Sequence, residues 1–102
     1  MKDKVLNKKS LERIKNIHKL SKLYNRKLKN NHKLRILELM KEHIAEIRRL
    51  YKKKNKHYLI ESGDLTILCF EFLLENKMSI DEILLKCLER YESKLPRLIK
   101  EA

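Results

Sequence analysis

Two short segments of the chain hold imidazole and carboxylate side chains at a spacing that suits a metal ion. His43 and Glu46 are three residues apart in the first segment, and Glu61 and Asp64 are three apart in the second. Residues three apart on a helix share a face. Two antiparallel helices would therefore bring the pairs together, which is one way in which a helical bundle builds a divalent-cation site. An ion held there can act as a Lewis acid on phosphate oxygens.

The residue types also indicate which metal would bind. Carboxylates suit Mg²⁺ or Mn²⁺, whereas the imidazole of His43 suits Zn, Mn or Fe better than the oxygen shell that Mg²⁺ prefers. On the expected helix His43 lies inside the apolar arc and Glu46 at its edge, while Glu42 points further toward solvent. The ordinary alternatives are a hydrogen-bonded core histidine, a Glu46 paired with a neighbouring arginine, and surface carboxylates paired with lysines.

The elements that must position these residues are helices. Leu, Ile, Lys and Glu dominate, and the chain has one Gly and one Pro, a composition typical of all-α proteins. We expect an all-α, four-helix bundle-like fold that dimerisation or higher oligomerisation completes. The sequence predicts a flexible basic N-terminus over residues 1–8 and a single helical domain over 9–102. Its helices are expected at about 10–29, 32–54, 58–76 and 80–95.

Several features refine this picture of the helices. Ser10 can cap the first helix, and Pro96 is expected to end or kink the last one. We interpret Cys69 and Cys87 as reduced core residues. The apolar stripe of the first helix is either core or a subunit interface. The stripe consists of Leu11, Ile14, Ile17, Leu20, Tyr24 and Leu28.

The helix expected over 58–76 is apolar around most of its circumference, so it should be mostly buried. Its only charged residues are acidic and fall on one side, and no Lys or Arg occurs between His57 and Asn76. Such a stripe requires a cation, either a metal ion or side chains of the basic helices. The acidic residues are Glu61, Asp64, Glu71 and Glu75.

The charge of the chain is strongly uneven. The net charge is +12, and residues 1–60 carry 20 Lys and Arg against 5 Asp and Glu. This imbalance favours anionic partners such as nucleotides, nucleic acid or acidic lipid, although a generally Lys-rich surface is an equally good explanation. Lys53 and Lys54, in the basic turn Lys52–Lys56, could contact phosphate or simply be solvated. No secretory signal or membrane-spanning run is visible, so we expect a cytoplasmic protein without a membrane partner.

The pattern from about Leu34 to Leu95 resembles the MazG-like, all-α nucleoside triphosphate pyrophosphohydrolases. The stretch Glu61-Ser-Gly-Asp64 matches the acidic pair E-x-x-D of that family, and Glu42-His-Ile-Ala-Glu46 is similar to the preceding pair E-x-x-E. Two positions depart from the family pattern: His43 stands where a Glu is usual, and Leu88 where an Asn often occurs. Arg90 and Lys94 fall where the family carries basic phosphate contacts.

The resemblance implies a homodimer or homotetramer in which Mg²⁺ at the four acidic positions assists attack of water on a nucleotide phosphoanhydride. It leaves open a divergent hydrolase, a hydrolase with another metal, or a relative that binds without turnover. The alternatives from other classes are a basic helical nucleic-acid-binding module and a non-catalytic structural oligomer. The remaining histidines, His18, His32 and His57, are too scattered in the sequence for an argument from metal-ligand spacing.

Overall fold

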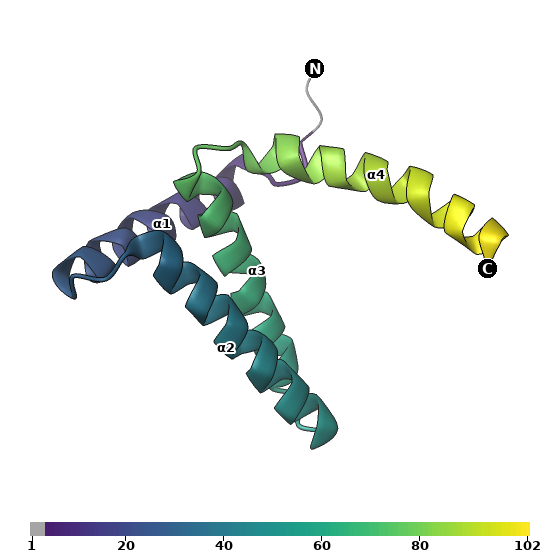
Figure 1. Ribbon diagram of the computed structural model, residues 1–102. Coiled ribbons are helices and arrows are strands. Elements are labelled where there is room, and N and C mark those ends of the chain that lie inside the picture. Colours follow the sequence, from purple (N-terminus) through teal and green to yellow (C-terminus); the bar gives the residue numbers. More distant parts are fainter. Residues whose placement is uncertain (1–3) are drawn as a thin grey trace.

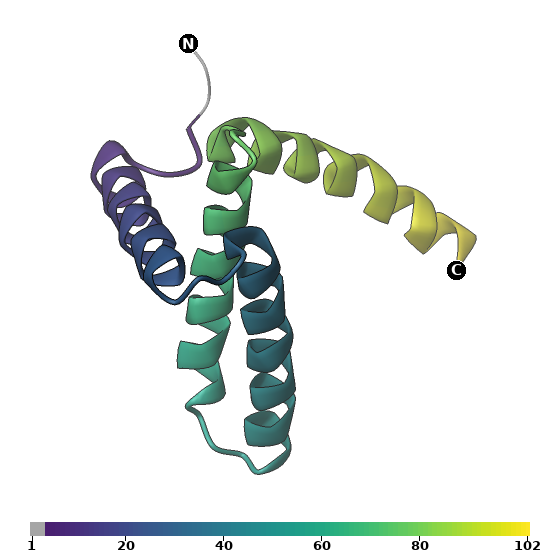
Figure 2. The same ribbon diagram turned by 60° about the vertical axis from the view of Figure 1, so that its left-hand side comes forward.

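The computed structural model describes residues 4–102, which form four α-helices and contain no β-strand. The helices are α1 (Lys8–Lys27), α2 (His32–Lys52), α3 (Tyr58–Glu75) and α4 (Ile80–Glu101). The chain reverses between α2 and α3, which lie side by side as a hairpin (Figures 1 and 2). α1 packs at the end of this hairpin where α2 begins and α3 ends. The predicted all-α, bundle-like fold is confirmed.

Three of the four helices are preceded by a residue whose side chain accepts a hydrogen bond from a backbone N–H of the first turn. Asn7 accepts from the backbone N–H of Ser10 at 2.8 Å, so α1 is capped by Asn7 and not by Ser10. Asn31 and Ser79 cap α2 and α4 in the same way. Such caps satisfy backbone N–H groups that have no partner within the helix. The short polar connections between helices therefore fix where each helix starts.

A lysine in the left-handed conformation follows each of the first three helices, two residues beyond its last helical residue. Lys29, Lys54 and Lys77 all have φ of 58°. The next residue along then donates its N–H to a carbonyl five positions back, as Asn30 does to Asn25 at 2.9 Å. This is the helix-ending turn in which glycine is preferred, because a side chain is strained at positive φ. The chain's single glycine, Gly63, lies inside α3 instead.

The apolar core is small and centred on the α2–α3 hairpin. On α2, Ile36 is fully buried and Leu50 nearly so, and His43 stands midway between them on the same seam. Residues seven apart on a helix share a face, so this seam is the one that contacts α3. The neighbouring seam of α2 is apolar but exposed. Its residues are Leu37, Ile44 and Tyr51.

α1 buries a largely polar face against the hairpin. Ile14 and Asn25 are buried, and Leu11 and His18 are partly buried, whereas Leu20, Tyr24 and Leu28 of the predicted stripe lie outward. Tyr24, for example, is 64% exposed. Much of the apolar stripe on this helix is therefore not core within one chain. The alternative of a subunit interface stays a prediction.

α4 leaves the helical body and extends away from it to the C-terminus (Figures 1 and 2). Its N-terminal end is attached to the start of the described chain, because Asp81 Oδ1 accepts the backbone N–H groups of Val5 and Leu6 at 2.7 and 3.1 Å. Residues 1–3 of the predicted flexible N-terminus lie outside the described residues. The helix continues through Pro96 to Glu101, so the expectation that Pro96 ends it is wrong. A proline removes only its own backbone N–H donor, and the turns on either side remain helical.

The two cysteines are free, and neither belongs to the core. Cys69 is exposed and Cys87 is half-buried, which corrects the expectation that both are core residues. The small core formed by α1, α2 and α3 does not enclose either cysteine. No helix within residues 4–102 is long and apolar enough to cross a membrane.

Candidate metal centre between α2 and α3

His43 of α2 and Glu61 of α3 face each other across the hairpin, with Asp64 one turn further along α3. His43 Nδ1 is in contact with Glu61 Oε2. One donor atom from each of His43, Glu61 and Asp64 can be chosen so that all three lie within 4.8 Å of one another. Asp64 is exposed and the other two are half-buried. Three of the four residues predicted to form the metal site are thus brought together, with a side open to solvent.

The surroundings of Glu61 favour a negative charge there. Glu61 lies in the first turn of α3, where the helix dipole stabilises anions. The exposed imidazole of His57 also approaches it, with Nε2 3.7 Å from Glu61 Oε1. His57 was not singled out from the sequence, although its position four residues before Glu61 puts both side chains on one face of the helix.

Glu46 is not part of this group. Its carboxylate accepts two hydrogen bonds from the Arg49 guanidinium, one of them from Nε at 3.0 Å. This bonding lowers the pKa of Glu46 and raises that of Arg49. Glu42 is exposed, and its Oε1 lies 3.7 Å from Arg35 Nη1. Glu46 therefore adopts the arginine pairing that the sequence left open as its ordinary alternative.

The basic turn between α2 and α3 forms a shallow hollow with two tyrosines. Tyr51 and Tyr58 lie edge to face, with ring centroids 5.4 Å apart. The hollow is lined by Tyr51, Lys52, Lys54, Lys56 and Tyr58. Of the two lysines singled out as phosphate contacts, Lys54 thus lines the hollow, whereas Lys53 is the exposed C-cap of α2. An aromatic pair flanked by cations is suited to a nucleobase and its phosphates.

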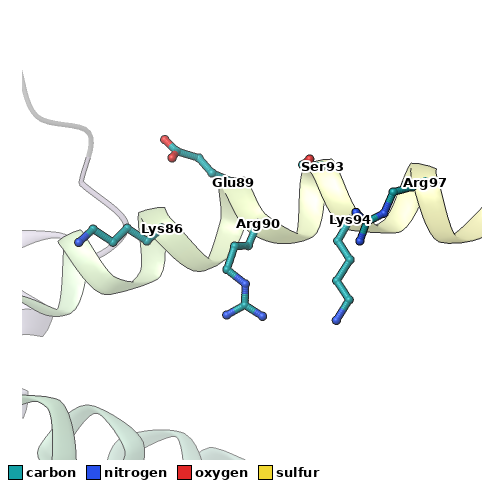
Figure 3. A pocket seen from close by; sticks show the side chains of 6 residues that line it. All are labelled: Lys86, Glu89, Arg90, Ser93, Lys94 and Arg97. Carbon is teal, nitrogen blue, oxygen red and sulfur yellow. The ribbon is translucent and has the colours of Figure 1, made fainter.

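Arg90 and Lys94 point to the same side of α4, away from Glu89 and Ser93 (Figure 3). They line a second hollow whose walls all belong to α4. α4 starts at the end of α3 opposite the hairpin turn and extends outward (Figure 1). Within one chain these two cations therefore do not join the group of His43, Glu61 and Asp64. The lining residues are Lys86, Glu89, Arg90, Ser93, Lys94 and Arg97.

A second group of imidazoles and carboxylates lies at the other end of the hairpin, beneath α1. It joins His18 of α1 and His32 of α2 to Glu71 and Glu75 of α3. Spacing along the sequence gives no sign of it, because the two histidines are on different helices. The acidic stripe of α3 was the available signal, since Glu71 and Glu75 belong to it and α3 itself contains no Lys or Arg.

No protein-family model matches the chain, and comparison with curated proteins and with solved structures also found no match. The resemblance to the MazG-like enzymes therefore rests on the sequence pattern between about Leu34 and Leu95 alone.

Proposed function

We propose that the protein is a metal-dependent nucleotide pyrophosphohydrolase-like protein. In this proposal it binds a nucleotide through a divalent ion at His43, Glu61 and Asp64 and acts on the phosphoanhydride. The observation that carries the proposal is the convergence of these three side chains from two helices at a solvent-open position. The similarity of Glu61-Ser-Gly-Asp64 to the MazG-like motif gives the reaction class.

The three side chains fit a divalent ion. Two carboxylates and one imidazole supply three donors, and the exposure of Asp64 leaves room for substrate or water on the ion. The imidazole favours Mn²⁺, Zn²⁺ or Fe²⁺, although Mg²⁺ remains possible through the carboxylates. When bound, the ion would polarise phosphate oxygens and lower the pKa of a water ligand.

The chain's own residues would then orient the nucleotide. The contact between Glu61 and His43 already holds these two side chains together, so that both could bind one ion. Lys54 and its neighbours in the tyrosine-lined hollow would bind phosphates or stack on the base. The two sites lie on one hairpin, so a single extended ligand could contact both.

We also propose that the active form is a homodimer or homotetramer. Beyond Cys87 the residues of α4 are all exposed, including an apolar stripe. The stripe consists of Leu88, Tyr91, Leu95, Leu98 and Ile99. Uncovered apolar stripes on α1, α2 and α4 are typical of chains that bury them against further copies.

The proposal is tested by incubating the protein with a panel of nucleoside triphosphates and Mg²⁺ or Mn²⁺ and measuring pyrophosphate release. Asp64→Asn should reduce turnover at least about 10- to 100-fold, the loss typical even for residues that only support a metal ligand. Glu38→Gln is the matched control, because Glu38 is an exposed carboxylate of α2 that pairs with Arg35. Absence of both turnover and metal-dependent nucleotide binding would contradict the proposal.

The second candidate is a nucleic-acid-binding module. The basic hollow on α4 and the tyrosine-lined hollow both favour it, since cations and stacking rings suit single-stranded nucleic acid. This candidate predicts an affinity for oligonucleotides that falls steeply with salt and does not require a divalent ion. Affinity that is insensitive to salt would contradict it.

A further inference from the structure

The interface between α1 and the hairpin contains an isolated group of buried polar atoms. Four buried side-chain nitrogen or oxygen atoms within residues 4–102 lack a hydrogen-bond partner, and all four belong to this group. They are His18 Nδ1, His32 Nε2, Glu71 Oε1 and Glu75 Oε2. Buried polar atoms are almost always satisfied, because each unsatisfied one destabilises the fold. Four in one place indicate a missing common partner.

Donor atoms of three of these residues are close enough to share one ion, and Glu75 lies beside them, with its Oε2 3.0 Å from His18 Nε2. His18 Nδ1 lies 3.7 Å from Glu71 Oε1, and His32 Nε2 lies 3.7 Å from Glu75 Oε2. Donor atoms of His18, His32 and Glu71 can be grouped within 4.8 Å of one another. A tetrahedral Zn²⁺ holds its ligand atoms about 3.3 Å apart, given bonds of about 2.0 Å. Small side-chain rotations would bring the donors to that spacing.

The site is enclosed and carries excess negative charge. The side chains of His32 and Glu71 are only 9% and 4% exposed. Lys22 Nζ lies 3.3 Å from Glu75 Oε1. The site therefore has one lysine cation against the two carboxylates of Glu71 and Glu75. A dication would neutralise both carboxylates, which buried charges require.

A supporting side chain orients His32. Asn25 is 5% exposed, and its amide nitrogen Nδ2 lies 2.8 Å from His32 Nδ1, which leaves Nε2 directed at Glu75. An amide that turns its oxygen to Nδ1 would accept the Nδ1 proton and free Nε2 to bind metal, the usual arrangement for a metal-binding histidine.

α1 turns this polar face inward although it has an apolar stripe. Asn25 and His18 are buried while Leu20 and Tyr24 are exposed. Packing alone would favour the opposite orientation of the helix. A ligand bound by these buried polar groups would explain why this face of α1 lies inward.

We propose that His18, His32, Glu71 and Glu75 form a closed, structural site for Zn²⁺ or a similar transition metal, which fastens α1 to the α2–α3 hairpin. The four protein donors fill a tetrahedral shell and leave no open position, as in structural rather than catalytic zinc sites. This site is separate from the group of His43, Glu61 and Asp64 and does not depend on the proposed nucleotide chemistry.

The test is a titration of chelator-stripped protein with Zn²⁺, in competition with a chromophoric chelator, and with Co²⁺ followed by visible absorption. It is run on the wild-type chain and on His43→Gln, which weakens any ion held by the other group. We expect one Zn²⁺ per chain in the enclosed site, a tetrahedral Co²⁺ spectrum, and a melting temperature that rises on the order of 10 °C at a hundredfold excess over Kd.

His32→Gln and Glu71→Gln should each weaken Zn²⁺ binding at least 100-fold, whereas His57→Gln, which changes an exposed histidine, should bind as the wild type does. A wild-type chain that shows neither a tetrahedral Co²⁺ spectrum nor a Zn²⁺-dependent rise in melting temperature would overturn the proposal. No variant is needed for this result. Zn²⁺ binding that survives Glu71→Gln unchanged would overturn it as well. Glu71→Gln preserves side-chain size, so it remains informative if His32→Gln fails to fold.

Discussion

His43 Nδ1 of α2 contacts Glu61 Oε2 of α3, and this contact joins the two helices that form the core of the molecule. His43 occupies a position on α2 that otherwise buries aliphatic residues, midway between Ile36 and Leu50. An ionisable pair at this place contributes less to packing than two aliphatic side chains would. Its position therefore favours a function in binding, which several measurements can examine.

The hairpin core should depend strongly on Ile36. This side chain is fully buried, so Ile36→Ala should lower the free energy of unfolding by about 2–5 kcal/mol through lost burial and a cavity. Ile60→Ala removes the same atoms from a residue of α3 that is 59% exposed and lies outside the proposed subunit interfaces, so it should change stability by no more than about 0.5 kcal/mol. Urea denaturation at one protein concentration compares the two. Equal shifts would show that the core does not lie at this seam.

The left-handed lysines at the helix ends predict a stabilising substitution. Lys77→Gly relieves side-chain strain at φ of 58° and should raise stability by about 1 kcal/mol, which is about 4–8 °C in melting temperature. Lys86→Gly is the matched control, because it puts glycine inside α4 and should destabilise that helix by about 1 kcal/mol. Thermal denaturation followed by circular dichroism distinguishes them. A lower melting temperature for Lys77→Gly would contradict the conformation of this turn.

The glycine inside α3 predicts another stabilising change. A Cβ added to Gly63 would meet no atom within 4 Å, and its φ is in the ordinary negative range. Gly63→Ala should therefore stabilise α3 by about 0.5–1 kcal/mol, because alanine loses less backbone entropy on folding. Chemical denaturation measures the gain. A loss of stability would mean that another molecule or another copy of the chain approaches the backbone closely there.

Self-association should depend on the apolar stripe of α4. Leu95→Glu introduces a charge into this stripe and should shift the protein toward monomer in sedimentation velocity runs across a range of concentrations. Ser93 lies about 160° from Leu95 around the helix, so Ser93→Glu adds the same charge on the other side and should leave the association unchanged. A wild-type chain that stays monomeric at every concentration would contradict the proposed oligomer.

The sequence predicts the helices and the group of His43, Glu61 and Asp64, because both depend on patterns that are local in the sequence. Helical periodicity and capping residues act locally, so α1 to α3 lie close to their expected ranges and α4 begins where expected, although it continues past its expected end. The pairs around His43 and Glu61 could likewise be related through one hairpin. What the sequence could not predict depends on rotation of a helix about its axis. α1 carries one polar and one apolar face, and only tertiary packing decides that His18 and Asn25 lie inward.

The same limit explains the outcome for Glu46 and Pro96. A carboxylate at the edge of an apolar arc can turn toward the core or toward Arg49, and the arginine three residues ahead is always within reach. Pro96 lies in an exposed segment where one missing backbone hydrogen bond is tolerated. The sequence pattern favours neither outcome for Glu46, whereas at Pro96 it favours an end or a kink, and α4 continues against that preference.

The central claim is that His43, Glu61 and Asp64 bind one divalent ion. It is tested most directly by titrating chelator-stripped protein with Mn²⁺ and following the electron paramagnetic resonance signal of free Mn²⁺. We predict one bound Mn²⁺ per chain at this group, weakened at least about 10- to 100-fold by Asp64→Asn and by Glu61→Gln, and retained in Glu71→Gln. A free Mn²⁺ signal that the wild-type protein does not reduce, or that Asp64→Asn reduces equally, would contradict the claim.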